Sequence, residues 1–166
     1  MQKLNDEVLK AILEKQIGKL GVWSGALGGV AGSGLLASLG GALGGGFGAR
    51  WAAGKLRARE YRDCLELPCP VEDTMKTAAS TLGAMPKFME WIHDEGHHDA
   101  PFVAALVGSG FFSMNPTILC LAFVPVETAA TAVHMAALAK EGLINQKSAE
   151  KAVLLFKGLL LAESSR

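Results

Sequence analysis

Three groups of side chains in this sequence are of types that could do chemistry. The first is Glu127, Thr131 and His134, which recur at intervals of four and three residues. On one α-helix this spacing places a carboxylate, a hydroxyl and an imidazole on the same face. Ionisable groups inside a membrane are costly and usually mark an ion or proton path. These residues are therefore the candidates for an ion or proton site. We favour the simpler interpretation, in which Glu127 marks the end of a membrane span and the next helix is amphipathic and lies outside the membrane.

The second group is the sequence WIHDEGHHDAP, in which His93, His97 and His98 stand among carboxylates. Imidazoles and carboxylates bind zinc and other divalent ions. The order does not match HExxH, because Asp94 stands in place of the glutamate and Gly96 interrupts the helix that would align the histidines. We predict a solvated turn and no metal here, with the three histidines as the candidate ligands if a metal binds.

The third group is the cysteines. Cys64 and Cys69 lie around Pro68, which indicates a turn, and Cys120 lies in an apolar run. The spacing matches no common zinc pattern, so we predict free thiols in a reducing compartment, with a local disulfide as the alternative. Neither GxSxG nor GxxxxGK[ST] occurs. We predict that the chain is not an enzyme and uses no cofactor.

The elements that must position these groups are dominated by two uncharged runs. The 166 residues are 50% apolar and 19% charged, and the 16 basic residues balance the 16 acidic ones, which gives no field to attract nucleic acid. Residues 20–49 and 100–126 carry no charge at all. Crossing a bilayer takes roughly 20 mostly apolar residues. Both runs are long enough, and the sequence therefore predicts an integral membrane protein.

The first run is rich in glycine. Of the 20 glycines, 12 lie between residues 21 and 48, many of them four apart. Glycines at this interval share one helix face and let another helix approach closely in a membrane. We predict a glycine-zipper-like span, against the alternatives of a flexible linker or a buried hairpin of two short helices. Its packing residues are Gly21, Gly25, Gly29, Gly32, Gly40, Gly44 and Gly48.

The remaining segments follow from proline, charge and apolar spacing. Asn115, Pro116 and Pro125 interrupt the second run, which predicts a kinked or re-entrant hydrophobic region over residues 100–141. The basic segment 50–62 follows the glycine run directly, and lysine and arginine mark the side that is not translocated. We place it on the cytoplasmic, matrix or stromal side. Apolar residues recur at helical spacing near both termini, which predicts two amphipathic helices. The apolar side of the second helix carries Val153, Phe156, Leu159 and Leu160.

Together these patterns predict an all-α helical membrane protein, in an organellar inner membrane or another membrane. Its segments are residues 1–19 (amphipathic helix), 20–49 (glycine-rich membrane helix), 50–99 (basic, then acidic connection), 100–141 (kinked hydrophobic helical region) and 142–166 (amphipathic helix).

We predict a small non-catalytic subunit that packs through its glycine face on other membrane helices, in a hetero-complex or a homo-oligomer within the lipid bilayer. One alternative is a self-assembling pore, channel or transport component that uses Glu127 and His134. A second alternative is a soluble helical protein that binds lipid or inserts into membranes.

Overall fold

The computed structural model describes residues 56–85, 88–92, 100–109, 115–127, 129–141 and 146–165. Within these ranges the chain forms five strands and two helices. In chain order they are β1 (Arg57–Leu67), α3 (Val71–Ala84), β2 (Phe88–Ile92), β3 (Phe102–Ser109), β4 (Asn115–Glu127), β5 (Ala130–Glu141) and α4 (Ser148–Ser164).

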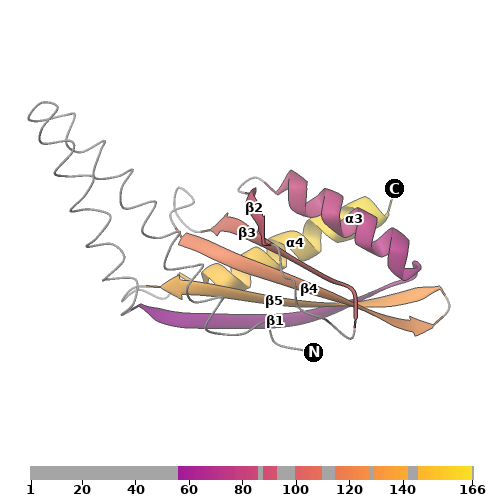
Figure 1. Ribbon diagram of the computed structural model, residues 1–166, viewed down its shortest axis with the longest axis horizontal. Coiled ribbons are helices and arrows are strands. Elements are labelled where there is room, and N and C mark those ends of the chain that lie inside the picture. Colours follow the sequence, from indigo (N-terminus) through magenta and orange to yellow (C-terminus); the bar gives the residue numbers. More distant parts are fainter. Residues whose placement is uncertain are drawn as a thin grey trace, which may run out of the picture.

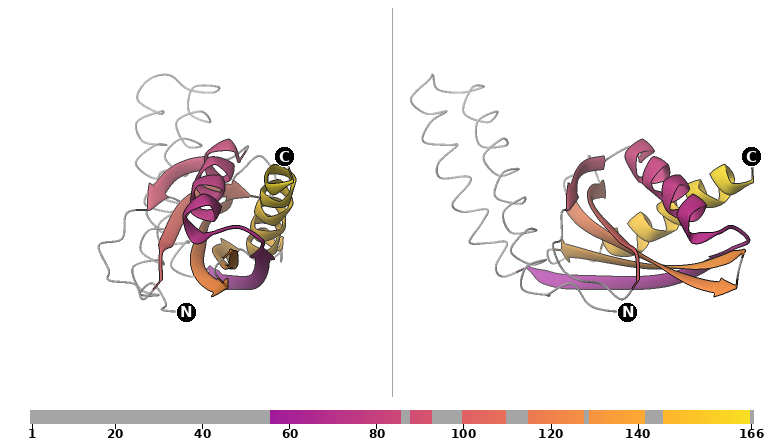
Figure 2. Two further views of the ribbon diagram at one scale, coloured as in Figure 1. Left: turned by 90° about the vertical axis from the view of Figure 1, so that its right-hand side faces the viewer. Right: turned by 45° about the vertical axis from the view of Figure 1, so that its right-hand side comes forward.

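The strands form one antiparallel sheet in the order β1-β5-β4-β3-β2. Both helices lie on the same side of this sheet (Figure 1). The sheet is curved, and α3 and α4 occupy its concave side (Figure 2). The architecture is therefore a two-layer α+β arrangement, in which the C-terminal helix α4 contacts β1, β3, β4 and β5 as well as α3.

Side-chain alternation explains why these segments form strands. Odd-numbered positions of β4 and β5 face the helices, and even-numbered positions face the other way, because successive side chains in a strand point to opposite sides. Leu119, Leu121 and Phe123 of β4 are fully buried on the helix side. Val133 and Met135 of β5 join them there, and the same parity holds across the paired strands.

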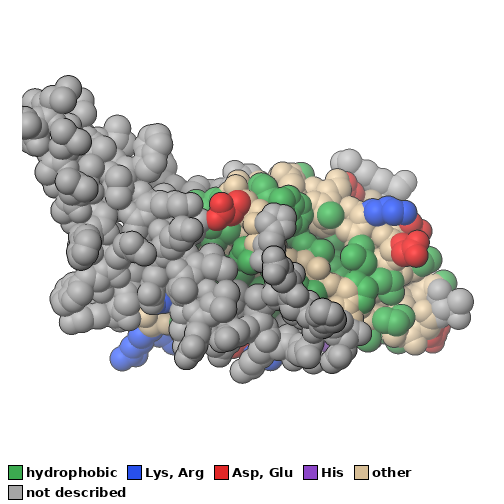
Figure 3. Space-filling view, viewed as in Figure 1, with side chains coloured by type: hydrophobic (Ala, Val, Ile, Leu, Met, Phe, Trp, Pro, Cys, Tyr) green, Lys and Arg blue, Asp and Glu red, His purple; other side chains and the backbone are tan. Residues whose placement is uncertain are grey.

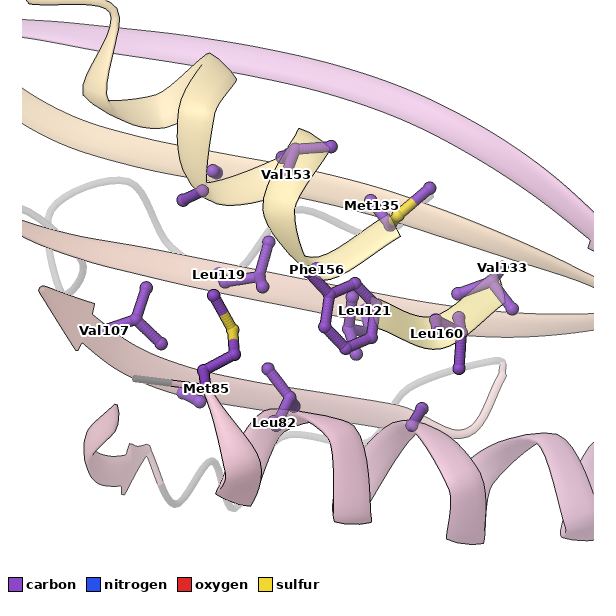
Figure 4. Close-up of a cluster of buried hydrophobic side chains, with 14 of the residues drawn as sticks. Leu82, Met85, Val107, Leu119, Leu121, Val133, Met135, Val153, Phe156 and Leu160 are labelled. Atoms are coloured by element: carbon purple, nitrogen blue, oxygen red, sulfur yellow. The ribbon is translucent and has the colours of Figure 1, made fainter. Parts of the chain in front are cut away.

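The main core lies between the sheet and the two helices (Figure 4). Phe156 of α4 points toward Leu121 of β4, and Leu82 of α3 approaches the same region from the other helix. All three side chains have no exposed surface. Full burial of a side chain of this size stabilises the fold by about 1.5–3 kcal/mol. This layer is what fixes α4 in place.

The opposite face of the sheet is also apolar at its centre. Leu106 of β3 and Ile118 of β4 are fully buried there, and Ala104 and Cys120 are nearly so. Toward the edge strand β1 the same face turns polar, with Glu60, Arg62, Cys64 and Glu66 at its even positions. The central strands are thus buried on both faces, and only the edge shows a polar side.

This architecture shows that the all-α prediction is wrong. The segment 100–141, expected to be a kinked helical region, contains β3, β4 and β5. Burial on both faces is the physical reason, because a strand covered on both sides reads as a continuous apolar run that periodicity alone does not distinguish from a buried helix. The alanines of β5, in ATAVHMAALAKE, strengthen the helical pattern further.

The two prolines that suggested helix kinks occupy positions that strands tolerate. Pro116 is the second residue of β4. Pro125 lies at a register shift between β4 and β5, two residues before Glu127. Proline lacks an N–H and is accepted in sheets at strand starts, edges and bulges. The prolines therefore mark the two ends of one long strand and do not mark a re-entrant turn.

The membrane predictions are corrected by the same observation. Among the described residues no helix is both long and apolar enough to cross a membrane. The uncharged run 100–126 lies in β3, β4 and the residues around them, so the second membrane region is wrong. The integral-membrane location, the membrane subunit and the pore all relied on a helical chain, and they are wrong with it. Of the alternative of a soluble helical protein that binds lipid, the helical part is wrong.

Some of the predicted features lie outside the described residues. These are the N-terminal amphipathic segment and the glycine-rich run, with Gly21, Gly25, Gly29, Gly32, Gly40, Gly44 and Gly48, together with His93, His97 and His98. Of the basic segment 50–62, the residues from Arg57 onward form the first half of β1. Because these residues lie in an edge strand of the sheet and do not follow a membrane span, they give no reason to assign them to one side of a membrane.

Candidate functional site

The three residues of the predicted ion or proton site do not share a face. Glu127 is exposed at the end of β4. Thr131 is fully buried at the start of β5, where its hydroxyl donates to the Cys69 carbonyl at 2.7 Å. His134 is three residues further along β5 and therefore points to the opposite side of the sheet. These residues lie in strands and not on one helix, so their spacing does not bring them together. The ion or proton site itself stays a prediction.

Helix α4 is held at its start by a carboxylate from the sheet. Glu141, the last residue of β5, is 2% exposed. Its carboxylate accepts the backbone N–H of Ser148 at 2.6 Å and that of Gln146 at 3.2 Å. The first N–H groups of a helix have no partner within the helix, and a negative charge there also complements the helix dipole. Glu141 thus anchors the N-terminus of α4 to the sheet.

A cap from the sheet is needed because the helix does not supply its own. The residue before the helix, Lys147, has a left-handed backbone (φ 54°) and makes no capping hydrogen bond with its side chain. Its ammonium pairs with Glu150 at 3.1 Å on the surface. The chain therefore turns sharply into α4, and Glu141 provides the acceptor that a serine or aspartate would normally provide.

Two further contacts hold the middle and the end of α4. The Lys157 ammonium donates to the Asp63 carboxylate of β1 at 2.7 Å. This bond, helped by the backbone N–H of Cys64, lowers the pKa of Asp63 below its ordinary value of 3.8. Near the C-terminus, the Thr81 hydroxyl of α3 donates to Glu163 at 2.7 Å. The orientation of α4 about its own axis is therefore fixed.

With that orientation fixed, α4 turns a second apolar face outward. Leu154, Leu155 and Leu161 are 48%, 44% and 42% exposed. Leu154, Gly158 and Leu161 follow one another at intervals of four and three, so they form one row along the helix. Nothing lies within 4 Å of the position where a Cβ on Gly158 would be. We call Leu154, Leu155, Gly158, Leu161 and Ala162 the outer face of α4.

The exposed apolar side chains of the outer face lie together on one helix, and this distinguishes them from single exposed residues elsewhere. Seven large apolar side chains are exposed among the described residues, and three of them lie on the outer face. Hydrophobic side chains also reach other parts of the described surface, as the view in Figure 3 shows. Contiguous exposed apolar groups usually mark an interaction site, whereas single ones are normal. The outer face of α4 is the candidate functional site.

No family model matches this chain, and no curated protein sequence matches it. Solved structures of similar shape include the Zhui aromatase/cyclase from Streptomyces sp. R1128 (9% identity over 66% of this chain and 95% of that one, TM-score 0.40). Another is a conserved protein from Geobacillus kaustophilus (10% identity over 64% of this chain and 92% of that one, TM-score 0.43). A third is a START superfamily protein from Mycobacterium smegmatis (8% identity over 64% of this chain and 97% of that one, TM-score 0.40). At these TM-scores the likeness carries no conclusion about ligand or activity.

Sequence reasoning missed this site although the signal is present. It assigned Val153, Phe156, Leu159 and Leu160 to one apolar side of the C-terminal helix. Three further leucines in the same segment, 154, 155 and 161, do not fit that side. A helix that is apolar all round is normally buried all round. Counting apolar residues on both sides of this segment would have predicted that α4 needs two partners.

Proposed function

We propose that this protein works by self-association, in which two copies bind each other through the outer face of α4. The observation that carries this proposal is that α4 is apolar on two opposite sides while the sheet covers only one of them. Leu160 is fully buried, and the next residue, Leu161, is 42% exposed. The proposal keeps the expectation that the chain acts by binding and is not an enzyme.

The charge distribution favours a second copy over an acidic or basic partner. The only charged side chain of α4 between Lys151 and Glu163 is Lys157, and it is directed to Asp63 of β1. The outer face therefore carries no charge between Leu154 and Ala162, and Lys151 stands one turn before it on the same side of the helix. Two such faces meet without like-charge repulsion, whereas a strongly charged partner would leave its charges without counterparts.

The arrangement of side chains suits a two-fold axis at Gly158. In an antiparallel pair of α4 helices, positions equally far from the axis face each other, as in any two-fold symmetric interface. Leu154 then meets Ala162 of the second copy, and Leu155 meets Leu161. The larger side chain of the first pair packs on a smaller one. Glycine at the axis lets the two backbones approach closely.

The helix ends are complementary in the same arrangement. Lys151 lies near the start of α4, and the last turn carries no basic residue. Antiparallel packing brings Lys151 of each copy toward the C-terminal end of the other helix. The carbonyl groups there carry partial negative charge, and a cation near them is stabilising. A parallel pairing would instead bring two Lys151 side chains together.

The mass of the full-length protein in solution tests the proposal. Sedimentation equilibrium over a range of concentrations should show a dimer that dissociates on dilution. Leu154→Glu should give a monomer, because pairing would bury an unpaired carboxylate. The matched control is Val126→Glu at the end of β4, where the valine is 51% exposed, and this variant should remain a dimer. A monomeric wild type, or an unchanged mass for Leu154→Glu, would overturn the proposal.

A cross-linking experiment tests the position of the axis. In a Cys64→Ser background, Gly158→Cys should form an intermolecular disulfide on mild oxidation, because only residues at the axis approach their own copies. Disulfides require Cα atoms within about 7 Å of each other. Lys151→Cys in the same background should not cross-link to itself. Equal cross-linking at both positions would rule out the antiparallel geometry.

A further inference from the structure

We propose that the face of the sheet opposite α3 and α4 is the docking surface for the N-terminal amphipathic segment of the same chain, residues 4–20. We call this face, formed by the even-numbered positions of the central strands, the second face of the sheet. It is separate from the outer face of α4, which belongs to the helix layer on the other side of the sheet (Figure 1). Docking here and the self-association described above are therefore independent of each other.

The second face is buried at its centre, although neither described helix lies on it. Leu106 and Ile118 have no exposed surface, and Ala104 and Cys120 are 3% and 7% exposed. Both described helices lie on the opposite side of the sheet (Figure 2). An antiparallel sheet with one face open to water carries polar residues on that face. The second face is apolar and buried, so a segment beyond the described strands and helices covers it.

The extent of this burial indicates the width of the covering segment. Even-numbered side chains are buried at the centres of β3 and β4, and on β5 they are half-buried at Ala136 and Leu138. On β1 they are exposed, as at Arg62 and Glu66. Neighbouring strands lie about 4.8 Å apart, so β3, β4 and β5 together span about 10 Å. A single α-helix with its side chains is about 10–12 Å wide. The covered area therefore has the width of one helix.

The length of chain before β1 makes it the source of the covering segment. Residues 1–55 precede the described part of the chain, whereas each of the other stretches outside the described residues has seven residues or fewer. The longest of these, residues 93–99, contains three carboxylates, which are costly to place on an apolar surface. Residues 110–114 join two paired ends of a hairpin and have no length left to cross the sheet. Only residues 1–55 are long enough.

The apolar pattern selects residues 4–20 within this stretch. Leu9, Ile12 and Leu13 recur at intervals of three and four, which gives a helix one apolar side. Glu7 and Glu14 fall on the opposite side, where they can face water. The glycine-rich run that follows has no charged side and is less suited to a surface position. Seventeen residues form a helix about 26 Å long. The 13 residues of β4 extend over about 43 Å, so the sheet is long enough to hold it.

Cys120 reports directly on the docking, because it lies on the second face itself. N-ethylmaleimide is added to the full-length protein at neutral pH, and peptide mass spectrometry gives separate rates of modification for each cysteine. Cys64 is exposed and serves as the internal reference. In the wild type we expect Cys120 to react at least about tenfold more slowly than Cys64, because the reagent reaches Cys120 only when the segment is transiently released.

Three variants then separate docking from general stability. Leu13→Glu should raise the Cys120 rate about tenfold or more, because docking would bury an unpaired carboxylate. Ala11→Glu is the matched control, since it adds the same charge about 200° around the helix and should leave the rate unchanged. Leu160→Ala weakens the main core on the other side of the sheet, and it should also leave the Cys120 rate unchanged.

Several outcomes would overturn the proposal. Equal rates for Cys120 and Cys64 in the wild type would mean that the second face is open. An unchanged Cys120 rate in Leu13→Glu, or an equal rise in Leu160→Ala, would mean that residues 4–20 do not cover it. Protection of Cys120 that is lost on dilution would indicate a second copy as the cover. If Leu13→Glu does not fold by circular dichroism, Leu13→Ala replaces it, with an expected rise of roughly fivefold because apolar contact is lost.

Discussion

Leu160 and Leu161 are consecutive leucines of one helix with opposite surroundings. Leu160 lies in the core between α4 and the sheet and has no exposed surface, whereas Leu161 is 42% exposed on the outer face. The residue type and the local sequence are the same. What differs is the position on the helix relative to the curved sheet, which covers one side of α4 only.

The apolar residues of α4 therefore serve two purposes. The inner side stabilises the monomer, and the outer face is available to a partner. If this division is correct, substitutions on the two sides should separate folding from association. The predictions below test the division from the largest expected effect to the smallest.

Truncation of the two leucines should give the largest contrast. Leu160→Ala leaves a cavity in the core and should lower the free energy of unfolding by roughly 2–5 kcal/mol. Leu161→Ala should change it by less than about 0.5 kcal/mol in the monomer, as is usual for surface substitutions. Urea denaturation followed by circular dichroism, at concentrations below dimer formation, measures both. Equal losses would mean that Leu161 is also part of the monomer core.

Loss of the Glu141 carboxylate should have an intermediate effect. Glu141→Ala leaves the buried N–H of Ser148 without its acceptor, which costs about 1–3 kcal/mol. Glu150→Ala is the matched control, because Glu150 is also acidic and lies in the first helical turn but makes only a surface ion pair with Lys147. That variant should lose less than about 1 kcal/mol. The same urea titration compares the two, and equal losses would show that Glu141 is not a specific anchor.

The smallest effect is expected on the flank of α4, at the ion pair between Lys157 and Asp63. Lys157→Met should cost at most about 1 kcal/mol at pH 7, because both side chains are partly exposed. The folded-state pKa of Asp63 is lowered, so the pair stabilises the fold fully above pH 3.8 and loses this effect as the pH falls through the lowered value.

The pH dependence gives this small effect a clear signature. Urea titrations of the wild type and Lys157→Met should differ at pH 7 and converge in strong acid. Lys76→Met, which removes a more exposed ion pair with Asp73, should follow the wild type at every pH. A difference between Lys157→Met and the wild type that persists in strong acid would point to lost packing of the lysine stem and not to the charge.

The sequence shows the helical period more clearly than the strand period, and the reason is physical. In α3 and α4 the apolar residues recur at the helical period, and each segment is bounded by a proline or a polar turn. In β4 the alternation is hidden, because Ile118 and Cys120 on one face are as apolar as Leu119 and Leu121 on the other. Composition alone then resembles a membrane span.

Pairings between distant parts of the chain were out of reach for a different reason. The pairing of Cys64 with His134 depends on strand register across seventy residues of sequence, and no local pattern encodes it. The spacing of Glu127, Thr131 and His134 was interpreted with a period of 3.6, whereas the strands impose a period of two. By contrast, the outer face of α4 is visible in the sequence once both sides of the helix are examined.

The carboxylate of Glu141 also has a consequence for the order in which the protein folds. The acceptor for the first turn of α4 belongs to the last residue of β5 and becomes available there only when β5 is paired in the sheet. Isolated helices of this length are marginal in water. Helix α4 is therefore expected to form late, after the strands have assembled. A dimer that forms through α4 would then contain only folded chains, because a chain without its sheet does not form the outer face through which two copies bind.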